Sequence, residues 1–296
     1  MNIVLLMALG LGVGPLALAG GIRFLLMRGT VPLDRRVAVL TAIAGLIPAM
    51  GAIPRLFVPW FPGTALNSDL GFRAATPLVL GVVALSMLMI PGPRARTSGV
   101  AALARRRIGQ FVSRRWTWTL LVLTALVLIL TIAAGSVSSR DENGHYTMYW
   151  ASMGTTTFGT NIYGWYFSTP SLIALALLLV MLFAALQVIA SRAWDDDVEA
   201  DGALRRLRST NVIRIGCGAT LIHLSVILQS LAGTSALRGQ STTTELGTVA
   251  MGTPFAALQP VLFWTGTAAF VVGLTICLIT ALIAIPVRSS MTAMRS

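Results

Sequence analysis

The chain has 296 residues, of which 55% are hydrophobic and 11% charged, and its formal net charge is +12. This balance excludes an ordinary soluble globular protein and predicts a membrane protein. All 22 basic residues are arginine, which excludes chemistry that needs a lysine, such as a Schiff base or a Walker-type phosphate-binding loop.

Seven apolar stretches are candidates for membrane-spanning helices, because a bilayer core needs about 20 mostly apolar residues per helix. They are residues 2–27, 37–54, 75–91, 116–136, 171–190, 212–232 and 260–287. The second and third stretches are short and have prolines in or beside them, which predicts a tilt or a kink. We therefore predict an all-α, polytopic fold in which residues 1–296 form a single integral membrane domain.

The arginines predict the orientation of this domain. The connectors 28–36, 92–115 and 192–211, together with the C-terminal tail, carry 16 arginines, whereas the connectors on the other side carry four. Because basic residues gather on the cytoplasmic side of a membrane, the N-terminus is predicted outside and the C-terminus in the cytoplasm. Arg23 and Arg214, near predicted helix ends, are expected to extend to the cytoplasmic interface.

After the first helix, the chain is predicted to form three helical hairpins. Each starts with cytoplasmic arginines, and a proline is predicted to open its returning helix, at Pro77, Pro170 and Pro260. A proline fits the first turn because its missing N–H has no partner within the helix there. The three hairpins are either copies of one repeat or simply ordinary hairpins, and the sequence leaves both interpretations open.

Two long connectors, 92–115 and 192–211, are predicted to lie in the cytoplasm. The first contains a basic amphipathic segment that suits anionic headgroups, and the second is acidic before it is basic. Both are interpreted as solvated connectors, or as surfaces that dock the membrane or a partner subunit; the docking residues are Arg105, Arg106, Arg107, Arg114, Arg115, Asp195, Asp196 and Asp197. Asp201 and Arg205 have the spacing of a weak helical ion pair.

The predicted spans contain no aspartate or glutamate, which disfavours proton-coupled pumps and aspartyl intramembrane proteases. His223 is the titratable candidate at depth, and with Gln187 and Gln229 it is a candidate ligand-binding group. Cys217 and Cys277 lie in apolar runs and are expected to be buried thiols. The glycines at 10, 12 and 14, and Ala269 with Gly273, are expected to allow close helix packing.

The connector 137–170 is predicted to be an aromatic-rich extracytoplasmic loop. Its candidate ligand-binding residues are Tyr146, Trp150, Tyr163, Trp165 and Tyr166. Such rings suit a segment lying at the headgroup level, and the alternative is a lid over an outward-facing cavity. Asp141, Glu142 and His145 are too few and too close in sequence to predict a metal site, and no cofactor is indicated.

Three functions are compatible with these residues. The first is a transport protein, or the membrane subunit of a transport complex, whose energy source lies on another chain. The second is a non-catalytic accessory or anchoring subunit of a larger membrane assembly, and the third is a lipid-processing enzyme, which the lack of an acid–base pair disfavours. Residues that converge on a cavity below the aromatic loop would favour transport. The expected location is a bacterial plasma membrane, with anionic lipid and other membrane or ATPase subunits as partners and no nucleic acid.

Overall fold

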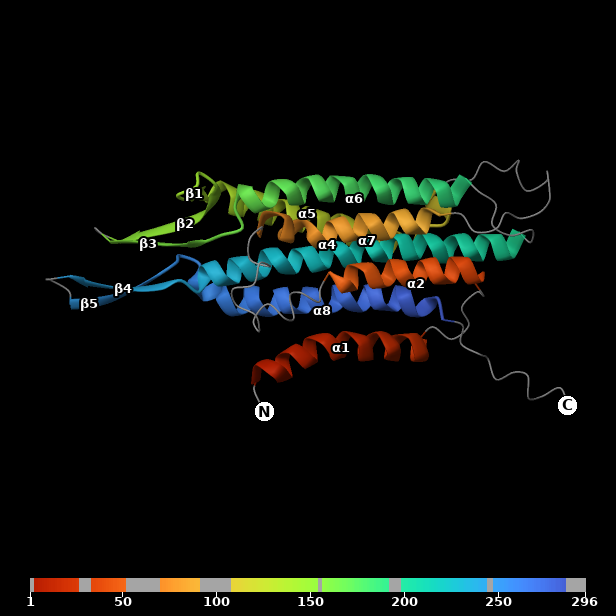
Figure 1. Ribbon diagram of the computed structural model, residues 1–296, viewed down its shortest axis with the longest axis horizontal. Coiled ribbons are helices and arrows are strands. Elements are labelled where there is room, and N and C mark those ends of the chain that lie inside the picture. Colours follow the sequence, from red (N-terminus) through yellow and green to blue (C-terminus); the bar gives the residue numbers. More distant parts are fainter. Residues whose placement is uncertain are drawn as a thin grey trace.

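The computed structural model describes residues 3–26, 33–51, 70–90, 108–153, 156–191, 198–243 and 247–285. Long helices dominate these residues and lie roughly side by side (Figure 1). They are α1 (Ile3–Leu26), α2 (Arg35–Met50), α4 (Leu70–Met89), α5 (Arg114–Ser136), α6 (Trp165–Ser191), α7 (Val198–Ser235) and α8 (Gln259–Ile283). Two short 3-10 turns, η3 (Ile108–Gln110) and η4 (Ala256–Leu258), precede α5 and α8.

Each predicted apolar stretch coincides with one of these helices. Among the described residues, four helical segments are long and apolar enough to cross a membrane: Arg114–Ser136, Trp165–Ser191, Glu199–Ser235 and Ala256–Ile283. Gly10–Leu25 and Arg73–Met89 are apolar but shorter. The predominantly helical fold is therefore confirmed, while seven membrane crossings and their orientation stay predictions.

Helix boundaries differ from the predictions in two respects. The stretch 212–232 is only the second part of α7, which has 38 residues and at 1.5 Å per residue is about 57 Å long. Pro260 lies in the first turn of α8 as predicted, but Pro77 and Pro170 lie inside α4 and α6. Those two helices begin upstream of the predicted apolar runs, at Leu70 and Trp165.

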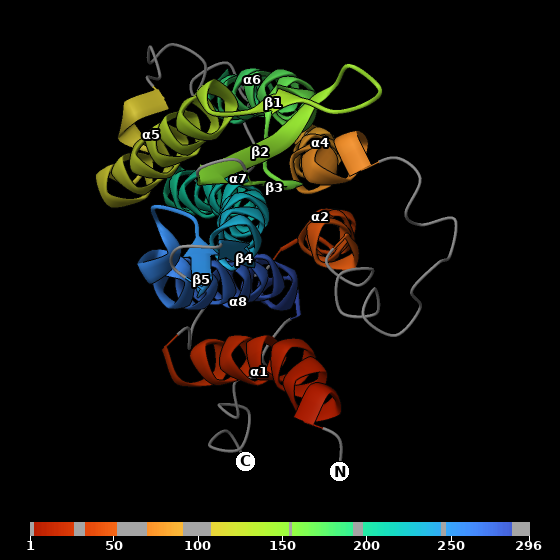
Figure 2. The same ribbon diagram turned by 90° about the vertical axis from the view of Figure 1, so that its left-hand side faces the viewer.

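Consecutive helices run in alternating directions, and α7 lies at the centre of the bundle (Figures 1 and 2). It packs against α8, α4, α5, α6 and α2. The N-terminal helix α1 lies at one side of the bundle, next to α8 (Figure 2). This arrangement fits the prediction of one extra helix followed by three hairpins, because α2 and α4, α5 and α6, and α7 and α8 are antiparallel neighbours.

Two small antiparallel sheets project from one end of the bundle, which we call the strand end (Figure 1). The first has the order β1 (Ser139–Arg140), β2 (Tyr146–Met153) and β3 (Thr156–Asn161), and the second pairs β4 (Arg238–Thr243) with β5 (Gly247–Gly252). These strands correct the all-α prediction, since segment 137–170, predicted as a loop, contains β1, β2 and β3. Threonine and aromatic residues favour strands. The strands were not predicted because the aromatic rings of this segment were assigned to the headgroup region instead.

Glycines bring the backbones of α7 and α8 together. A Cβ added at Gly273 would lie 2.9 Å from the carbonyl oxygen of Gly218, so the predicted close packing at Gly273 is confirmed. The same prediction is wrong for Gly10 and Gly14, where an added Cβ would meet no described atom within 4 Å. These glycines lie on a side of α1 that turns away from the other described helices, which a sequence pattern cannot reveal.

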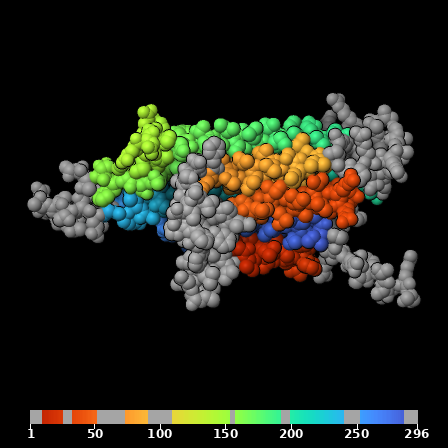
Figure 3. All heavy atoms as spheres, in the orientation of Figure 1, coloured from red at the N-terminus to blue at the C-terminus, as the bar shows by residue number. Residues whose placement is uncertain are grey.

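Large apolar side chains cover the outward sides of several helices and are exposed. They include Val13, Leu16 and Phe24 on α1, Leu121, Val122 and Ile129 on α5, Ile173, Val180 and Phe183 on α6, and Val261, Trp264 and Val272 on α8. Figure 3 shows α6, α4, α2, α8 and α1 following one another across one face of the molecule. A contiguous apolar surface of this kind is unfavourable in water and fits a lipid environment.

Candidate functional site

His223 lies near the middle of α7 and is completely buried. Its Nδ1 atom is 2.8 Å from the carbonyl oxygen of Ala74 on α4. A carbonyl oxygen can only accept, so Nδ1 carries the proton and donates it. In a neutral imidazole Nε2 is then an acceptor, and the Tyr163 hydroxyl lies 3.4 Å from it. The ring planes of the two residues meet edge to face.

Tyr163 is directed into the bundle by the short link between β3 and α6. The Ile162 N–H donates to the Thr147 carbonyl at 2.8 Å, and the Thr234 hydroxyl donates to the Asn161 carbonyl at 2.8 Å, which fixes the end of β3 against α7. Gly164 follows, and a Cβ there would collide with the Tyr146 carbonyl oxygen, so this close approach requires glycine. The structure thus brings together two predicted site residues that are 60 positions apart.

Two further hydroxyl groups lie beside this pair, and a third lies one turn away on α6. Burial raises the pKa of Tyr163 to about 12, and the neighbouring Ser171 and Thr131 hydroxyls oppose that rise. Thr131 lies on α5, and Ser168 lies on α6 one turn before Ser171; all three are buried. We call Thr131, Tyr163, Ser168, Ser171 and His223 the polar core. Sequence reasoning identified only its tyrosine and histidine, because serine and threonine are common in helices of any kind.

Gln187 and Gln229 do not join the polar core. Gln187 is exposed and lies close to the end of α6 that is farthest from the strands. Gln229 is half-buried between α7 and α8, beside Gly266. His223, Gln187 and Gln229 therefore do not meet among the described residues, and their role in ligand binding stays a prediction.

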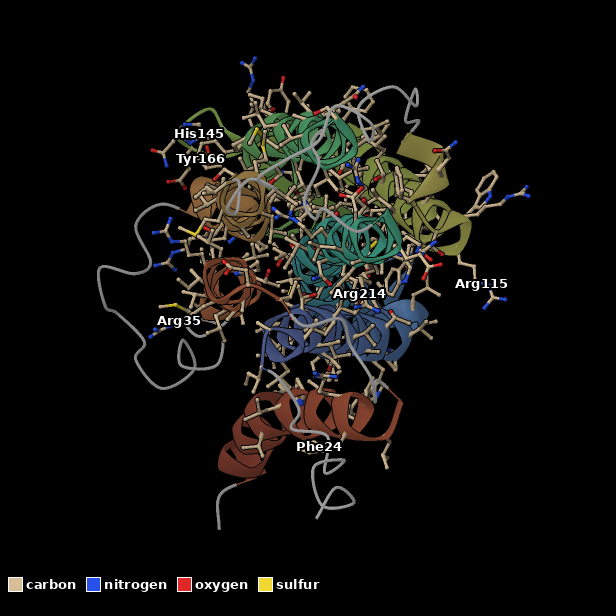
Figure 4. All side chains as sticks on the ribbon, turned by 90° about the vertical axis from the view of Figure 1, so that its right-hand side faces the viewer. Phe24, Arg35, Arg115, His145, Tyr166 and Arg214 are labelled. Carbon is tan, nitrogen blue, oxygen red and sulfur yellow. The ribbon has the colours of Figure 1, made fainter. Side chains whose placement is uncertain are left out.

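The aromatic residues of segment 137–170 connect the sheet to the helix ends. The His145 and Tyr166 ring centroids are 4.3 Å apart, and Figure 4 labels these two side chains next to each other. The Arg140 guanidinium lies 5.2 Å from the centre of the Tyr146 ring. Trp150 pairs with Gly159 across the strands, and its ring covers that glycine. Trp165 covers Gly135 at the end of α5 in the same way. Four of the five predicted aromatic site residues therefore have partners at the strand end, and Tyr163 alone of the five reaches the polar core.

The turn between β1 and β2 is organised by Asp141. Its carboxylate accepts from the backbone N–H groups of Asn143 and His145, at 2.9 and 2.8 Å, and from the Thr147 hydroxyl at 2.9 Å. Desolvation alone would raise the pKa of Asp141, but hydrogen bonds from His145, Thr147 and Asn143 lower it below the usual 3.8. An aspartate whose side chain bonds the backbone two residues later is a typical turn former.

Acidification is expected to loosen this turn. Because folding lowers the pKa of Asp141, its bonds favour the folded turn above the unfolded pKa, and that contribution is lost as the pH falls through the folded pKa. Amide hydrogen exchange should show lower protection of Asn143 and His145 below pH 3.8 than at neutral pH, after correction for the intrinsic exchange rate. Asp141→Ala should give the low protection already at neutral pH, whereas Glu142→Ala, on an exposed neighbour, should not. Protection that is unchanged in Asp141→Ala would contradict this role.

The residues predicted to dock a membrane or a partner are only partly described. Arg105, Arg106, Arg107, Asp195, Asp196 and Asp197 lie outside the described residues. Arg114 and Arg115 begin α5 and are exposed, and Figure 4 shows Arg115 pointing away from the bundle. Arg214 is half-buried, with its guanidinium 5.5 Å from the centre of the Trp116 ring. Only Arg114 and Arg115, among the described docking candidates, are placed to reach a headgroup or another subunit.

Asp201 and Arg205 form a buried ion pair, not the weak surface pair that their spacing suggested. The Arg205 Nε atom lies 2.7 Å from Asp201 Oδ2, and Arg205 is completely buried. Its Nη1 atom donates to the carbonyls of Ala190 and Ile189, at 2.6 and 3.4 Å, where α6 ends. The guanidinium also lies 5.5 Å from the centre of the Phe111 ring. The Asp201–Arg205 pair is buried because α7 begins earlier than expected and packs against the end of α6.

Two other buried arginines bond to helix ends in the same way. Arg208 Nη2 donates to the Leu88 and Ile90 carbonyls at the end of α4, at 2.8 and 3.4 Å. Arg23 on α1 donates to the Leu282 and Ile285 carbonyls at the end of α8, at 3.3 and 3.1 Å, and its position at the membrane interface stays a prediction. We call Arg23, Arg205 and Arg208 the arginine clamps, and the end of the bundle that holds them the clamped end.

The clamps suit the electrostatics of helix ends. The last carbonyls of a helix lack partners within it and carry a partial negative charge of roughly half an electron. The carbonyl ends of α6 and α4, together with the Asp201 carboxylate, balance the two positive charges of Arg205 and Arg208. Each clamp also joins two helices: α7 to α6, α7 to α4, and α1 to α8. The contacts between helices at the clamped end therefore depend on buried charge as well as on apolar packing.

The fold and these sites define a predominantly helical protein with apolar helices long enough to cross a membrane, a polar core and a clamped end. No protein family, curated protein or solved structure shows a significant match to the chain. Function must therefore be argued from the arrangement of its residues.

Removing the Tyr163 hydroxyl is expected to weaken the polar core. Tyr163→Phe deletes the donor to His223 Nε2 and leaves a buried acceptor short of one bond, which costs roughly 1–3 kcal/mol. Thermal unfolding of the detergent-solubilised protein should show the loss. The matched control is Tyr146→Phe, because the Tyr146 ring is exposed at the strand end. Equal unfolding temperatures for the two variants would mean that the Tyr163–His223 contact does not stabilise the bundle.

Proposed function

We propose that the chain is a multi-pass protein of a bacterial plasma membrane, with all seven long helices crossing the bilayer and the strand end outside the cell. The exposed apolar sides of α1, α5, α6 and α8 support a lipid environment. The alternating directions bring the described helix ends that adjoin the arginine-rich connectors to one side of the bundle, the clamped end, and this supports a cytoplasmic location for it. The two sheets then stand in the extracytoplasmic space.

We infer that its role is that of a non-catalytic subunit that anchors a membrane assembly and presents the two sheets to a partner outside the membrane. The arginine clamps carry this inference. Each clamp ties a helix that ends on the cytoplasmic side to a neighbouring helix through charge-assisted bonds to backbone carbonyls. Opening a cytoplasmic passage between these helices would break the charge-assisted bonds that hold the helix ends together.

Transport is the second candidate, and the polar core is the observation that favours it. Buried hydroxyl groups and the His223 imidazole meet between α4, α5, α6 and α7, in the half of α7 closer to the strand end. A transport role would require the clamped end to open, and its energy source would lie on another chain, as expected from the sequence. The two functions therefore differ in whether the clamped end moves.

Distances across the clamped end test the two functions. Pairs of spin labels at Gln187 and Arg206, and at Ser86 and Arg206, use exposed positions on either side of the Arg205 and Arg208 clamps. In liposomes, an anchoring subunit should give one narrow distance distribution for each pair. A second, longer distance in either pair would reject the anchoring role and favour transport. Labels at Ser136 and Trp264, exposed at the strand end, serve as the reference pair.

Topology and partner contact are tested separately. A cysteine at Ser152, exposed on β2, should react with an impermeant reagent in intact cells, and a cysteine at Arg206 should not. The reverse result would overturn the orientation. A photoreactive residue at Trp150 should yield a discrete crosslinked species in native membranes, whereas one at Val180, on the apolar side of α6, should crosslink only to lipid. Absence of a protein crosslink from Trp150 would remove the support for partner presentation through β2.

A further inference from the structure

Arg214 differs from the two arginine clamps on the same helix. Arg205 bonds to Asp201 and to carbonyls at the end of α6, and Arg208 bonds to carbonyls at the end of α4. Arg214 lies about two turns further along α7 and is half-buried. Its partner among the described residues is the Trp116 ring, whose centre lies 5.5 Å from the guanidinium. Within the described part of the chain, no carboxylate or carbonyl oxygen therefore balances the charge of Arg214.

Arg214 lies at the level where α5 begins. Both α5 and α7 lead from the clamped end to the strand end (Figure 1). Cys217 Sγ lies 4.0 Å from the Trp116 carbonyl oxygen, so these two residues are level with each other. Counting back along each helix places Arg115 and Arg214 within about one turn of each other along the bundle. Two arginines therefore lie near the level of Trp116, one beside its ring and one next to it in sequence.

Apolar side chains continue from this level along the outward side of α5. Trp118, Leu121, Val122 and Ile129 are each more than half exposed. Leu121 and Val122 begin between one and two turns beyond Trp116, toward the strand end. A phospholipid has the same order of chemistry, with a phosphate at the membrane interface and acyl chains beneath it. The positive charges and the apolar side of α5 therefore match both parts of one lipid.

The chemistry of the guanidinium favours a phosphate as its counter-ion. Arginine presents several N–H donors in a planar fork, which fits two phosphate oxygens at once. The arginines at this level have no acidic partner among the described residues, so a ligand with a net negative charge is favoured over a zwitterion. Basic pockets between transmembrane helices on the cytoplasmic side of a membrane bind anionic headgroups in this way.

We propose that Arg214 and Arg115, with the Trp116 ring, bind the phosphate of one anionic phospholipid, whose acyl chains lie against the outward side of α5. The phosphate accepts hydrogen bonds from the Arg214 guanidinium and balances its charge. This inference rests on the proposed location of α5 and α7 in a bilayer. It is independent of which side of the membrane the clamped end faces, and of the choice between anchoring and transport.

Lipid retention in native mass spectrometry tests the site. The detergent-solubilised protein is incubated with an equimolar mixture of phosphatidylglycerol and phosphatidylcholine, and one phosphatidylglycerol per chain should be retained in preference. Arg214→Gln should reduce the retained fraction by about tenfold, because it removes the charge-assisted bonds to the phosphate. Equal retention of the two lipids by the wild type, or equal phosphatidylglycerol retention by the wild type and Arg214→Gln, would overturn the proposal.

A matched variant separates a defined site from general attraction between a basic protein and anionic lipid. Arg35→Gln also removes one positive charge, at the exposed start of α2, and Figure 4 shows Arg35 and Arg115 on opposite sides of the clamped end. Retention should not change in Arg35→Gln, and it should fall by about threefold in Arg115→Gln. Equal losses in these two variants would contradict the site. Both positions are exposed, so this comparison stands even if Arg214→Gln does not fold.

Inorganic phosphate distinguishes a lipid site from a site for any small anion. In a large excess of inorganic phosphate the wild type should keep its phosphatidylglycerol, because the free anion has no acyl chains to place against α5. Displacement of the lipid would mean that the site binds the anion alone, and would overturn the proposal. A failure here leaves the cysteine labelling at Ser152 and Arg206 unaffected, so it is distinguishable from a failure of the proposed topology.

Discussion

Arg205→Ala is expected to reduce the free energy of unfolding by about 3–5 kcal/mol, the largest effect that we expect from a single change in this protein. The substitution leaves the Asp201 carboxylate buried without the ion pair, whose Nε–Oδ2 distance is 2.7 Å. It also removes the donor to the Ala190 and Ile189 carbonyls, so the end of α6 loses its bonds to α7. Reversible unfolding in mixed micelles, followed by circular dichroism, measures the loss.

Three comparisons separate the clamp from a general effect of charge. Arg206→Ala removes the adjacent arginine, which is exposed, and should be nearly neutral. Asp201→Ala combined with Arg205→Ala should cost less than the sum of the two single changes, because the buried carboxylate disappears with its partner. Arg205→Lys should lie between wild type and Arg205→Ala, since an ammonium group cannot reproduce the planar donor geometry. Equal losses for Arg205→Ala and Arg206→Ala would contradict the clamp.

The sequence predicted the helices well because their signal is local. A run of about 20 apolar residues identifies a helix without knowledge of its neighbours, and every such run became one. The start of α7 was missed because Asp201, Arg205 and Arg208 are charged, and charged residues were assigned to solvent. Their burial depends on the ends of α4 and α6, which lie more than 100 and about 15 residues away in sequence. No local pattern contains that information.

The polar core shows the same limit. His223 and Tyr163 were each singled out, the first as the histidine at depth and the second as one of several clustered rings. Their contact depends on the link after β3, where Gly164 passes against the Tyr146 carbonyl. The strands themselves were missed because aromatic and threonine residues suit both a sheet and the headgroup region. Composition identified the residues available, while long-range packing determined which of them meet.

Gly273→Ala is expected to destabilise the bundle by about 1–3 kcal/mol, because it places a methyl group into a backbone contact. The added Cβ would lie 2.9 Å from the Gly218 carbonyl oxygen and 2.9 Å from Leu221 Cβ, and 3.0 Å from Ile222 Cγ1. Relief requires α7 and α8 to separate, since one of these atoms belongs to the backbone. The unfolding free energy in mixed micelles measures the effect, and Gly273→Val should be worse than Gly273→Ala.

A glycine on the partner helix α7 supplies a control of opposite sign. Gly233 lies inside α7, and an added Cβ there would meet no described atom within 4 Å. Gly233→Ala should therefore stabilise the protein by about 0.5–1 kcal/mol, because alanine loses less backbone entropy than glycine on forming a helix. If Gly273→Ala were also stabilising, helix propensity would outweigh packing at both positions. The α7–α8 contact would then be looser than the structure describes, and the same substitution at Gly218 should be tolerated.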